Sequence, residues 1–234
     1  MDVGQVSRKR RLPVNKVVLK NSSNRERITV TSAEQDRTVR DPSNGYEAVA
    51  SEFIRLRERA GVGTEVVRKW ARSLRRGGTI LDLGCGTGVP VSQVLISEGF
   101  AVYGIDASPT LAAEFHRRFP DAPLACEPVE CSRFFERKFD GVVAIGLLFL
   151  LPATTQRATI HKVGRALTSG GRFLFTCPTR RCTWTDSLTG RPSFSLGADE
   201  YKAVLSDAGF TLIGEYEDEG ENHYYDTSLS RPPS

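Results

Sequence analysis

Short apolar runs alternate with amphipathic stretches along the chain from residue 79 onward. Continuously apolar runs such as "TILDLG", "AVYGID" and "FDGVVAIG" predict strands that are buried on both faces. Between them, "SPTLAAEFHRRF" and "TTQRATIHKVGRAL" carry apolar residues at three- and four-residue spacing, which predicts helices. Strands that alternate with helices pair in parallel through right-handed crossovers. The pattern therefore predicts an α/β fold, with a doubly wound sheet and helices on both faces.

The end of the chain breaks this alternation. After a predicted helix near residues 198–208 come two β-like stretches, "FTLIGEYED" and "NHYYDTSL", with almost no room for a crossover helix between them. Strands joined by so short a connection pair antiparallel. We therefore expect an antiparallel hairpin at one edge of the sheet.

Two helical patterns precede the first strand. In "SNGYEAVASEFIRLRERAG" apolar residues recur at three- and four-residue spacing from Tyr46 to Leu56. Thr64 can cap a second stretch, whose apolar stripe includes Trp70. We expect these helices, within residues 41–77, to cover a functional site.

The first forty residues have too few periodic apolar positions to bury a face. We interpret residues 1–40 as a basic, disordered or loosely attached tail, with at most a short strand at 17–20. The remaining residues, 41–234, then form one domain. After these helices, we expect the alternating strands and helices of the core at 78–178, followed by a loop, helix and terminal hairpin at 179–234.

The positive charge of the chain lies in its tail. Residues 1–40 hold ten Lys and Arg against four Asp and Glu, a net charge of +6, whereas residues 41–234 hold 22 against 24, a net charge of −2. The domain thus lacks the positive total of a dedicated nucleic-acid surface, and nucleic acid is disfavoured as a partner.

No apolar run approaches the roughly 18 to 20 residues of a membrane span, and the first residues lack the apolar core of a secretion signal. The five cysteines are an odd number without a cluster of histidines beside them, which fits a reducing compartment and predicts no metal site. We therefore expect a cytoplasmic protein without a membrane partner.

The stretch "ILDLGCGTGVP" places three glycines within five positions, directly after the first buried strand. Glycine permits the positive φ of a tight turn and lets a ligand approach the backbone, at the place where open α/β sheets bind ligands. The spacing G-x-G-x-G differs from the G-x-G-x-x-G of dinucleotide sites, which disfavours a nicotinamide-linked dehydrogenase. Asp106 follows Gly84 by 22 residues and can accept hydrogen bonds from both hydroxyls of a ribose. We therefore expect a nucleoside ligand without a pyrophosphate.

Five stretches resemble, in order and spacing, the motifs of the class I S-adenosylmethionine-dependent methyltransferases: "ILDLGCGTGVP", "VYGIDAS", "FDGVVAIGLLFLLP", "RALTSGGRFLFTCP" and "LSDAGF". The resemblance extends from about residue 46 to the C-terminus. It implies a Rossmann-like seven-stranded sheet with the last strand antiparallel, in agreement with the hairpin expected above. It also implies S-adenosyl-L-methionine as the cofactor and S-adenosyl-L-homocysteine as its product.

The resemblance assigns cofactor-binding roles to individual positions. Asp82 would orient the glycine loop and approach the methionine amino group, and Asp106 would hold the ribose. Adenine would lie near "PVEC", where the acid that many relatives use aligns with Pro128. Tyr46 lies where many relatives close a helix over the cofactor, although a core aromatic is the competing interpretation. The candidate cofactor-binding residues are Tyr46, Asp82, Gly84, Cys85, Gly86, Asp106, Ala107, Pro128, Val129, Glu130, Ile145 and Gly146.

Methyl transfer requires mainly that two reactants are aligned and water is excluded. The stretch "GLLFLLP" lacks the Asn/Asp-Pro-Pro-Tyr/Phe element that is typical of enzymes methylating nucleobase or glutamine amines. We therefore expect transfer to an O or N nucleophile of a small-molecule metabolite. Two alternatives stay open: an RNA- or protein-directed methyltransferase steered by the basic tail, and a non-catalytic regulatory protein that binds S-adenosylmethionine.

Candidate residues for the acceptor lie in two places. Trp184, in the long segment "TRRCTWTDSLTGRPSFSLG", either walls an aromatic substrate or anchors its own loop. On the last strand His223 and Tyr225 share a face and Tyr224 points the other way, so at most one of these sets faces the site. His223 is the candidate general base, since its ordinary pKa lies near working pH, and a surface histidine is the alternative.

Overall fold

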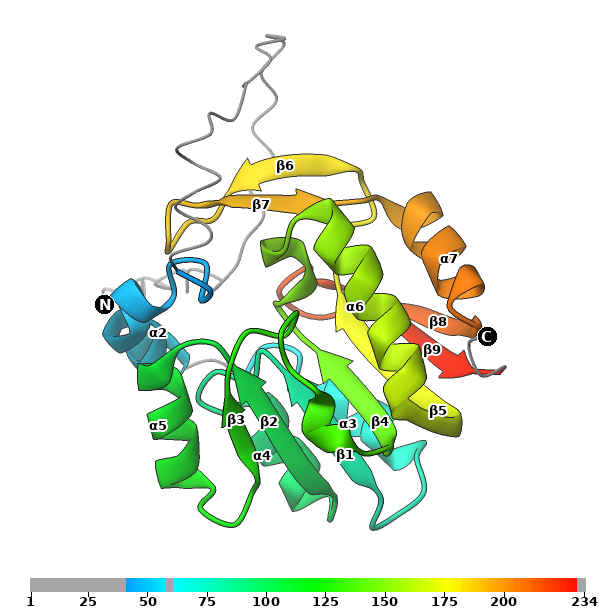
Figure 1. Ribbon diagram of the computed structural model, residues 1–234, viewed down its shortest axis with the longest axis horizontal. Coiled ribbons are helices and arrows are strands. Elements are labelled where there is room, and N and C mark those ends of the chain that lie inside the picture. Colours follow the sequence, from blue (N-terminus) through cyan, green and yellow to red (C-terminus); the bar gives the residue numbers. More distant parts are fainter. Residues whose placement is uncertain (1–40, 58–60, 231–234) are drawn as a thin grey trace, which may run out of the picture.

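The computed structural model describes residues 41–57 and 61–230, so the predicted tail and its short strand lie outside the described residues. A seven-stranded sheet forms the middle layer of the domain, with helices on both faces (Figure 1). Its strand order is β3-β2-β1-β4-β5-β9-β8. The strands are β1 (Thr79–Leu83), β2 (Ala101–Asp106), β3 (Leu124–Cys126), β4 (Phe139–Ala144), β5 (Leu167–Thr176), β8 (Phe210–Glu217) and β9 (His223–Leu229).

The direction of pairing follows the predicted pattern. Strands β1 to β5 pair in parallel, whereas β9 pairs antiparallel with both β5 and β8. The predicted doubly wound sheet and its antiparallel terminal hairpin are therefore confirmed. The winding reverses at β1, which has β2 on one side and β4 on the other, and ligands bind at the carboxyl ends of strands around such a switch point.

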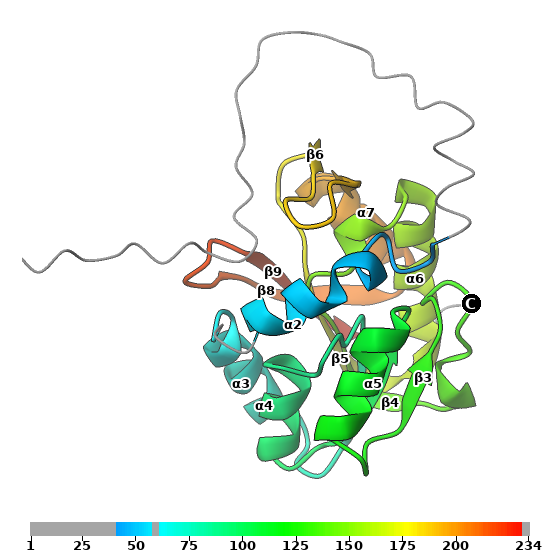
Figure 2. The same ribbon diagram turned by 90° about the vertical axis from the view of Figure 1, so that its left-hand side faces the viewer.

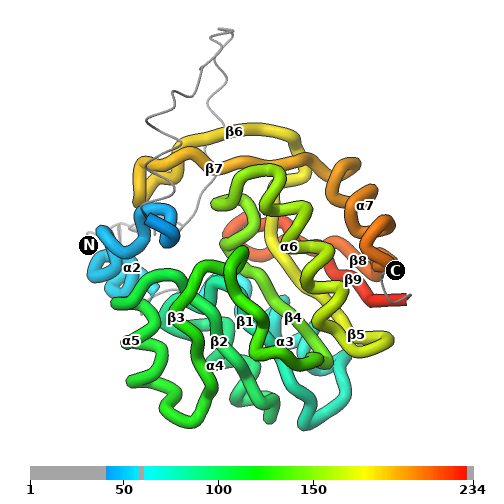
Figure 3. Tube along the Cα trace, viewed as in Figure 1, coloured from blue at the N-terminus to red at the C-terminus, as the bar shows by residue number. Residues whose placement is uncertain are grey.

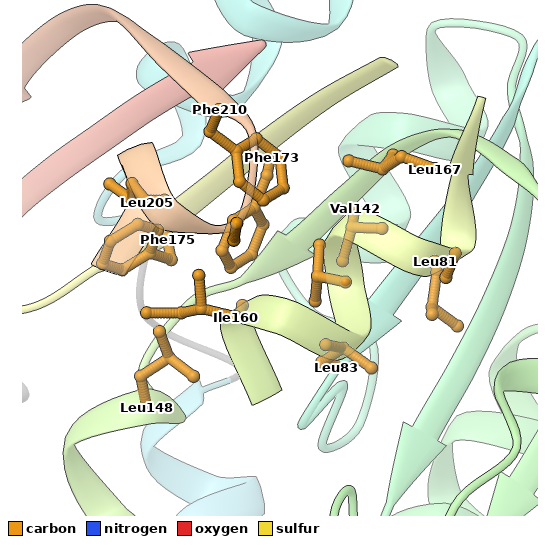
Figure 4. Packing of buried hydrophobic residues seen from close by; sticks show 14 of the residues in the cluster. Leu81, Leu83, Val142, Leu148, Ile160, Leu167, Phe173, Phe175, Leu205 and Phe210 are labelled. Carbon is orange, nitrogen blue, oxygen red and sulfur yellow. The ribbon is translucent and has the colours of Figure 1, made fainter. Parts of the chain in front are cut away.

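Helices cover the two faces in separate groups (Figure 2). One face carries α3 (Thr64–Arg72), α4 (Val91–Ser97) and α5 (Pro109–Arg118), and the other carries α6 (Ala153–Ala166) and α7 (Ala198–Asp207). Under α3 and α4, Trp70 packs with apolar residues of β1, β2 and β4 and donates a 3.1 Å hydrogen bond from Nε1 to Asp226. Beneath α6, Ile160 lies among Leu83, Val142 and Phe175 (Figure 4). Each large apolar side chain that is fully buried in this way contributes about 1.5–3 kcal/mol.

The N-terminal segment and the β6–β7 hairpin, which is described below, lie at the carboxyl edge of the sheet (Figure 3). The first pattern of residues 41–77 begins as a 3-10 helix, η1 (Glu47–Val49), and continues as α2 (Ala50–Arg57). Two further 3-10 turns, η2 (Phe134–Glu136) and η3 (Leu148–Leu150), flank β4. None of the described helices is long and apolar enough to cross a membrane.

The segment between β5 and α7 is not the irregular loop that its length suggested. It forms a separate antiparallel pair, β6 (Cys182–Thr185) and β7 (Pro192–Ser195), which arches above the carboxyl edge of the main sheet (Figure 1). Asp186 closes the turn by accepting backbone hydrogen bonds from Leu188 and Thr189 at 3.0 and 2.8 Å. This Asx-type turn and the β-branched and aromatic residues of β6 explain why a hairpin forms here.

Candidate functional site

A pocket lies at the carboxyl ends of β1 to β4 and encloses about 730 Å³ of empty space, part of it open to solvent. Loops that follow the four strands line one side of the pocket, and the N-terminal segment of residues 42–57 lines another side. The lining residues are Pro42, Ser43, Asn44, Tyr46, Phe53, Arg57, Gly84, Gly86, Ile105, Asp106, Ala107, Leu111, Glu127, Val129, Glu130, Ile145, Gly146, Leu147, Leu150 and Leu151.

The glycine loop needs glycine for both conformation and space. Gly84 and Gly86 have φ of 67° and 55°, values that L side chains rarely adopt. A Cβ on Gly86 would lie 3.2 Å from the ring of Phe53, and one on Gly84 would lie 3.1 Å from Leu147. The loop therefore passes close beneath the pocket, with its backbone open to a ligand.

Asp106 is bonded directly to this loop. Its Oδ2 accepts a 2.7 Å hydrogen bond from the backbone N–H of Gly86, and its Oδ1 accepts one of 2.9 Å from Ser108. Burial raises the pKa of the Asp106 carboxyl, and the two backbone donors oppose that shift. The carboxylate is thus fixed at the pocket wall, at the end of β2, where the sequence predicted an acceptor for a ribose.

Nine of the twelve candidate cofactor-binding residues line the pocket: Tyr46, Gly84, Gly86, Asp106, Ala107, Val129, Glu130, Ile145 and Gly146. The other three, Asp82, Cys85 and Pro128, do not, and their roles stay predictions. Asp82 is 2 % exposed and accepts a 2.6 Å hydrogen bond from Ser92 of α4, and burial raises its pKa to about 7. Cys85 turns inward, so that a Cβ on Gly104 would lie 2.9 Å from its Sγ.

An arginine that the sequence reasoning missed also lines the pocket. Arg57 lies four residues after Phe53 on α2, and its guanidinium lies over the Phe53 ring at 5.2 Å from the centroid. It makes no ion pair or hydrogen bond with any residue in 41–57 or 61–230, and burial lowers its pKa. Since residues four apart share a face of a helix, the spacing from Phe53 was the signal that could have indicated this position. The pocket thus contains a guanidinium that no described residue binds directly, although the charges of Asp82 and Asp218 act on it.

Glu127 was also missed. It stands one position before Pro128, directly after β3, and its backbone N–H donates a 3.0 Å hydrogen bond to the carbonyl of Asp106. Its side chain lines the pocket, together with Val129 and Glu130. The acid expected near the adenine is therefore present one residue earlier than the alignment at Pro128 suggested.

The N-terminal segment is attached on two sides. On one side Glu47 accepts hydrogen bonds from the backbone N–H and the hydroxyl of Thr110 at 3.1 and 2.6 Å, and from the Ser108 hydroxyl; these bonds lower its pKa. On the other side Arg191 of the β6–β7 hairpin forms a 2.8 Å ion pair with Asp41. The segment therefore bridges α5 and the hairpin across the pocket.

Tyr46 takes part in the same bridge. Its hydroxyl donates a 3.3 Å hydrogen bond to Asp186 of the hairpin, and its ring meets Phe53 edge to face at 5.4 Å. Burial, followed by the negative charge of Asp186, raises the pKa of Tyr46 well above its ordinary value. The hydroxyl therefore stays protonated at neutral pH and acts as a donor.

None of the four acceptor candidates lines the pocket. Trp184 packs against Phe149 with ring centroids 5.4 Å apart, and this favours the loop-anchor alternative. Tyr224 and Tyr225 are buried on opposite faces of β9, at 1 % and 0 % exposure. His223 is bonded to Glu215 of β8 at 3.1 Å, so its role as a general base stays a prediction that its position does not support.

The described residues contain no group of three or more His, Cys, Asp or Glu side chains that could hold a metal ion. All five cysteines, which lie within 61–230, are free thiols. The chemistry of the pocket is therefore that of hydrogen-bonding groups, carboxylates and one guanidinium.

We compared the chain with known protein families, curated proteins and solved structures. A family model described as a methyltransferase domain matches residues 80–171, which include the glycine loop and Asp106. No curated protein matches the chain in sequence. Many solved structures match it in fold.

Three of these structures illustrate the degree of similarity in sequence and fold. Magnesium protoporphyrin IX methyltransferase from Synechocystis PCC 6803, with bound S-adenosylmethionine, is 18% identical with a TM-score of 0.57, over 86% of this chain and 85% of that chain. The CcbJ methyltransferase from Streptomyces caelestis is 15% identical with a TM-score of 0.64, over 82% and 98%. The 1,6-didemethyltoxoflavin-N1-methyltransferase from Burkholderia thailandensis, with its substrate and S-adenosylhomocysteine, is 18% identical with a TM-score of 0.59, over 81% and 91%.

These structures share the fold at low identity. Residues 80–171 match a methyltransferase domain, and the seven-stranded sheet has the fold of S-adenosylmethionine-dependent methyltransferases.

Proposed function

We propose that this enzyme transfers the methyl group of S-adenosylmethionine to an O or N nucleophile of a small-molecule acceptor. The observation that carries the proposal is the convergence of three features on one pocket: the glycine loop, the Asp106 carboxylate and the Arg57 guanidinium, which no described residue binds directly. Together they complement a ligand that has a ribose and a free amino-acid carboxylate.

The pocket fits this cofactor in shape and in charge. Gly84 and Gly86 line the pocket, and Leu147 and Phe53 pack so close to them that an added Cβ would lie 3.1–3.2 Å from these side chains. We assign Asp106 to the ribose hydroxyls, Glu127 to the adenine side and Arg57 to the carboxylate of the methionine part. An arginine and a carboxylate form charge-assisted hydrogen bonds, which are stronger than those between neutral groups.

The protein's own contribution is to align the reactants and to exclude water. The cofactor supplies an electrophilic methyl group on a cationic sulfur. Tyr46 and Phe53 cover the glycine loop with two rings in edge-to-face contact, and the bridge from α5 to the hairpin holds that cover in place. Positioning of this kind can contribute on the order of 7–11 kcal/mol to lowering the barrier.

A small acceptor is supported by the cover over the pocket. The segment of residues 42–57 forms part of the wall, and such a cover is better suited to a compact molecule than to a polymer. Two of the similar structures are named for compact substrates, a magnesium porphyrin and a didemethyltoxoflavin. Five free thiols support a cytoplasmic location as part of the proposal.

Calorimetry with S-adenosylhomocysteine tests the cofactor assignment, and we expect saturable binding to a single site. The acceptor is sought by incubating the enzyme with methyl-labelled S-adenosylmethionine and fractionated cell metabolites. Label in a small-molecule fraction supports the proposal. Label only in RNA or protein, lost when residues 1–40 are deleted, would favour the tail-directed alternative, and binding without any label transfer would favour the regulatory one.

A further inference from the structure

The loop between β3 and η2 forms the part of the pocket wall that we assign to the adenine. Three of its residues line the pocket: Glu127, Val129 and Glu130. Its start is held by the main chain, since the N–H of Glu127 donates to the carbonyl of Asp106 at 3.0 Å. Among the described residues, the backbone–backbone hydrogen bonds of residues 128–132 stay inside the loop. The position of the loop in the pocket wall therefore depends on side-chain contacts.

Lys162 of α6 supplies such a contact. Its Nζ donates to the carbonyl of Val129 at 3.0 Å and to that of Glu130 at 3.2 Å. The same ammonium lies 4.5 Å from the centre of the buried Phe134 ring, a distance at which a cation and an aromatic face attract each other. One side chain thus binds two consecutive carbonyls of the pocket wall and is itself held by a ring of the core.

The charge of Lys162 suits it to this place. Desolvation lowers the pKa of Lys162, and the acidic groups of Cys131, Glu127 and Glu130 oppose that shift. A charged donor makes stronger hydrogen bonds than a neutral one. In the described part of the chain, no other group donates to the carbonyls of Val129 and Glu130. Removal of the ammonium would therefore leave two adjacent peptides of the loop without the contact that fixes them.

We propose that Lys162 is a positioning residue for recognition of the adenine. By binding the carbonyls of Val129 and Glu130, it holds the loop so that the Glu127 carboxylate meets the amino group of the base. Lys162 does not line the pocket itself, so it acts through the loop. The inference rests on the proposed function, because it takes S-adenosylmethionine as the ligand and Glu127 as the residue beside its adenine.

Two nucleosides that differ in the base test this inference. S-adenosylhomocysteine carries an amino group at C6 of the purine, whereas S-inosylhomocysteine carries an oxygen there. Calorimetry measures the dissociation constant of each. We expect wild type to bind S-adenosylhomocysteine at least about tenfold more tightly, since a site built to bind an amino group rejects a ligand that lacks it.

Three variants separate the ammonium from the rest of the side chain. Lys162→Met keeps an unbranched side chain of similar length without a donor, and should reduce the preference for the adenine to about threefold or less. Lys162→Arg keeps a cationic donor, and should keep the preference above about fivefold. Lys69→Met, at an exposed position of α3, is the matched control and should behave as wild type.

The stoichiometry of binding shows whether each variant is folded, because unfolded protein lowers the number of sites and leaves the dissociation constant unchanged. If Lys162→Met yields no protein that binds, Lys162→Gln gives the same comparison, since its neutral amide is the weaker donor.

The inference is overturned if wild type binds the two nucleosides equally, or if the variant without the ammonium keeps the tenfold preference, even when it binds both nucleosides more weakly. It is also overturned if Lys162→Arg loses the preference as fully as Lys162→Met. A wild-type enzyme that binds neither nucleoside would contradict the proposed function, and the inference with it. The two failures are distinguishable because binding of S-adenosylhomocysteine to wild type is measured first.

Discussion

The hydroxyl of Tyr46 donates a hydrogen bond to Oδ2 of Asp186 across 3.3 Å, joining positions that lie 140 residues apart in the chain. Tyr46 lines the pocket, whereas Asp186 closes the turn of the β6–β7 hairpin. The ion pair between Asp41 and Arg191 joins the same two segments. The N-terminal cover and the hairpin therefore act as one unit above the site.

This coupling is measurable by a double-mutant cycle. Tyr46→Phe removes the donor and Asp186→Asn removes the charge of the acceptor, and we expect a coupling of about 0.5–1.5 kcal/mol in the free energy of unfolding. Urea denaturation of wild type, both single variants and the double variant gives this value. If the effects of the two substitutions simply add, the segments are not linked through this hydrogen bond.

Asp106→Ala should weaken binding of S-adenosylhomocysteine by about 1.5–3 kcal/mol, because a charged acceptor of hydrogen bonds is lost. Calorimetry measures the change. Asp121→Ala, an exposed carboxylate in the turn before β3, is the matched control and should bind normally. Equal affinity of the Asp106 variant and wild type would refute the ribose assignment.

Arg57→Ala should discriminate between two nucleosides. S-adenosylhomocysteine carries the carboxylate assigned to Arg57, so its binding should weaken by about 1.5–3 kcal/mol. 5′-Methylthioadenosine lacks that carboxylate and should bind the variant as it binds wild type. Arg133→Ala, with a side chain 83% exposed, serves as the control. A similar loss for both nucleosides would assign Arg57 to another part of the ligand.

Asp82 should make stability depend on pH. Burial raises the pKa of its carboxyl from 3.8 in the unfolded reference to about 7, so the folded state holds the proton more tightly. The stabilisation is fully present below about pH 4 and is lost as pH rises through 7, with a slope of up to about 1.4 kcal/mol per pH unit.

Asp82→Asn removes this titration and can still bond to Ser92. Denaturation at several values between pH 5 and 8 should show the free energy of unfolding of wild type falling relative to the variant as pH rises. A constant difference between the two proteins across this range would mean that Asp82 is ionised in the folded state throughout.

His223→Gln should leave catalysis unaffected once an acceptor is found. The imidazole is bonded to Glu215 at 3.1 Å and lies outside the pocket wall. We expect kcat and its pH profile between pH 6 and 9 to match wild type. A loss of activity in this variant, together with loss of the acidic limb of the profile, would restore His223 as the general base and require the hairpin to move during turnover.

The sequence determined most of the fold because its signals are local. Continuous apolar runs and helical spacing predicted the parallel strands and their crossover helices, and the short connection before residue 223 predicted the antiparallel hairpin. The glycine loop and Asp106 could also be predicted from short stretches of sequence, since neighbouring residues determine a tight turn and the end of a strand.

The remainder of the site depends on packing between distant segments. Asp82 is on the same face of β1 as Ile80, so strand alternation turns it toward Ser92 in α4 and away from the pocket. Arg57 and Asn44 reach the pocket only because Glu47, Tyr46 and Asp41 attach their segment to α5 and to the hairpin. No local sequence pattern predicts those contacts, because they form between residues that lie more than 60 positions apart in the chain. The sequence thus determined the fold and the positions of the glycine loop and Asp106, and the tertiary structure decided which side chains surround the pocket, because their placement depends on contacts that only the folded chain makes.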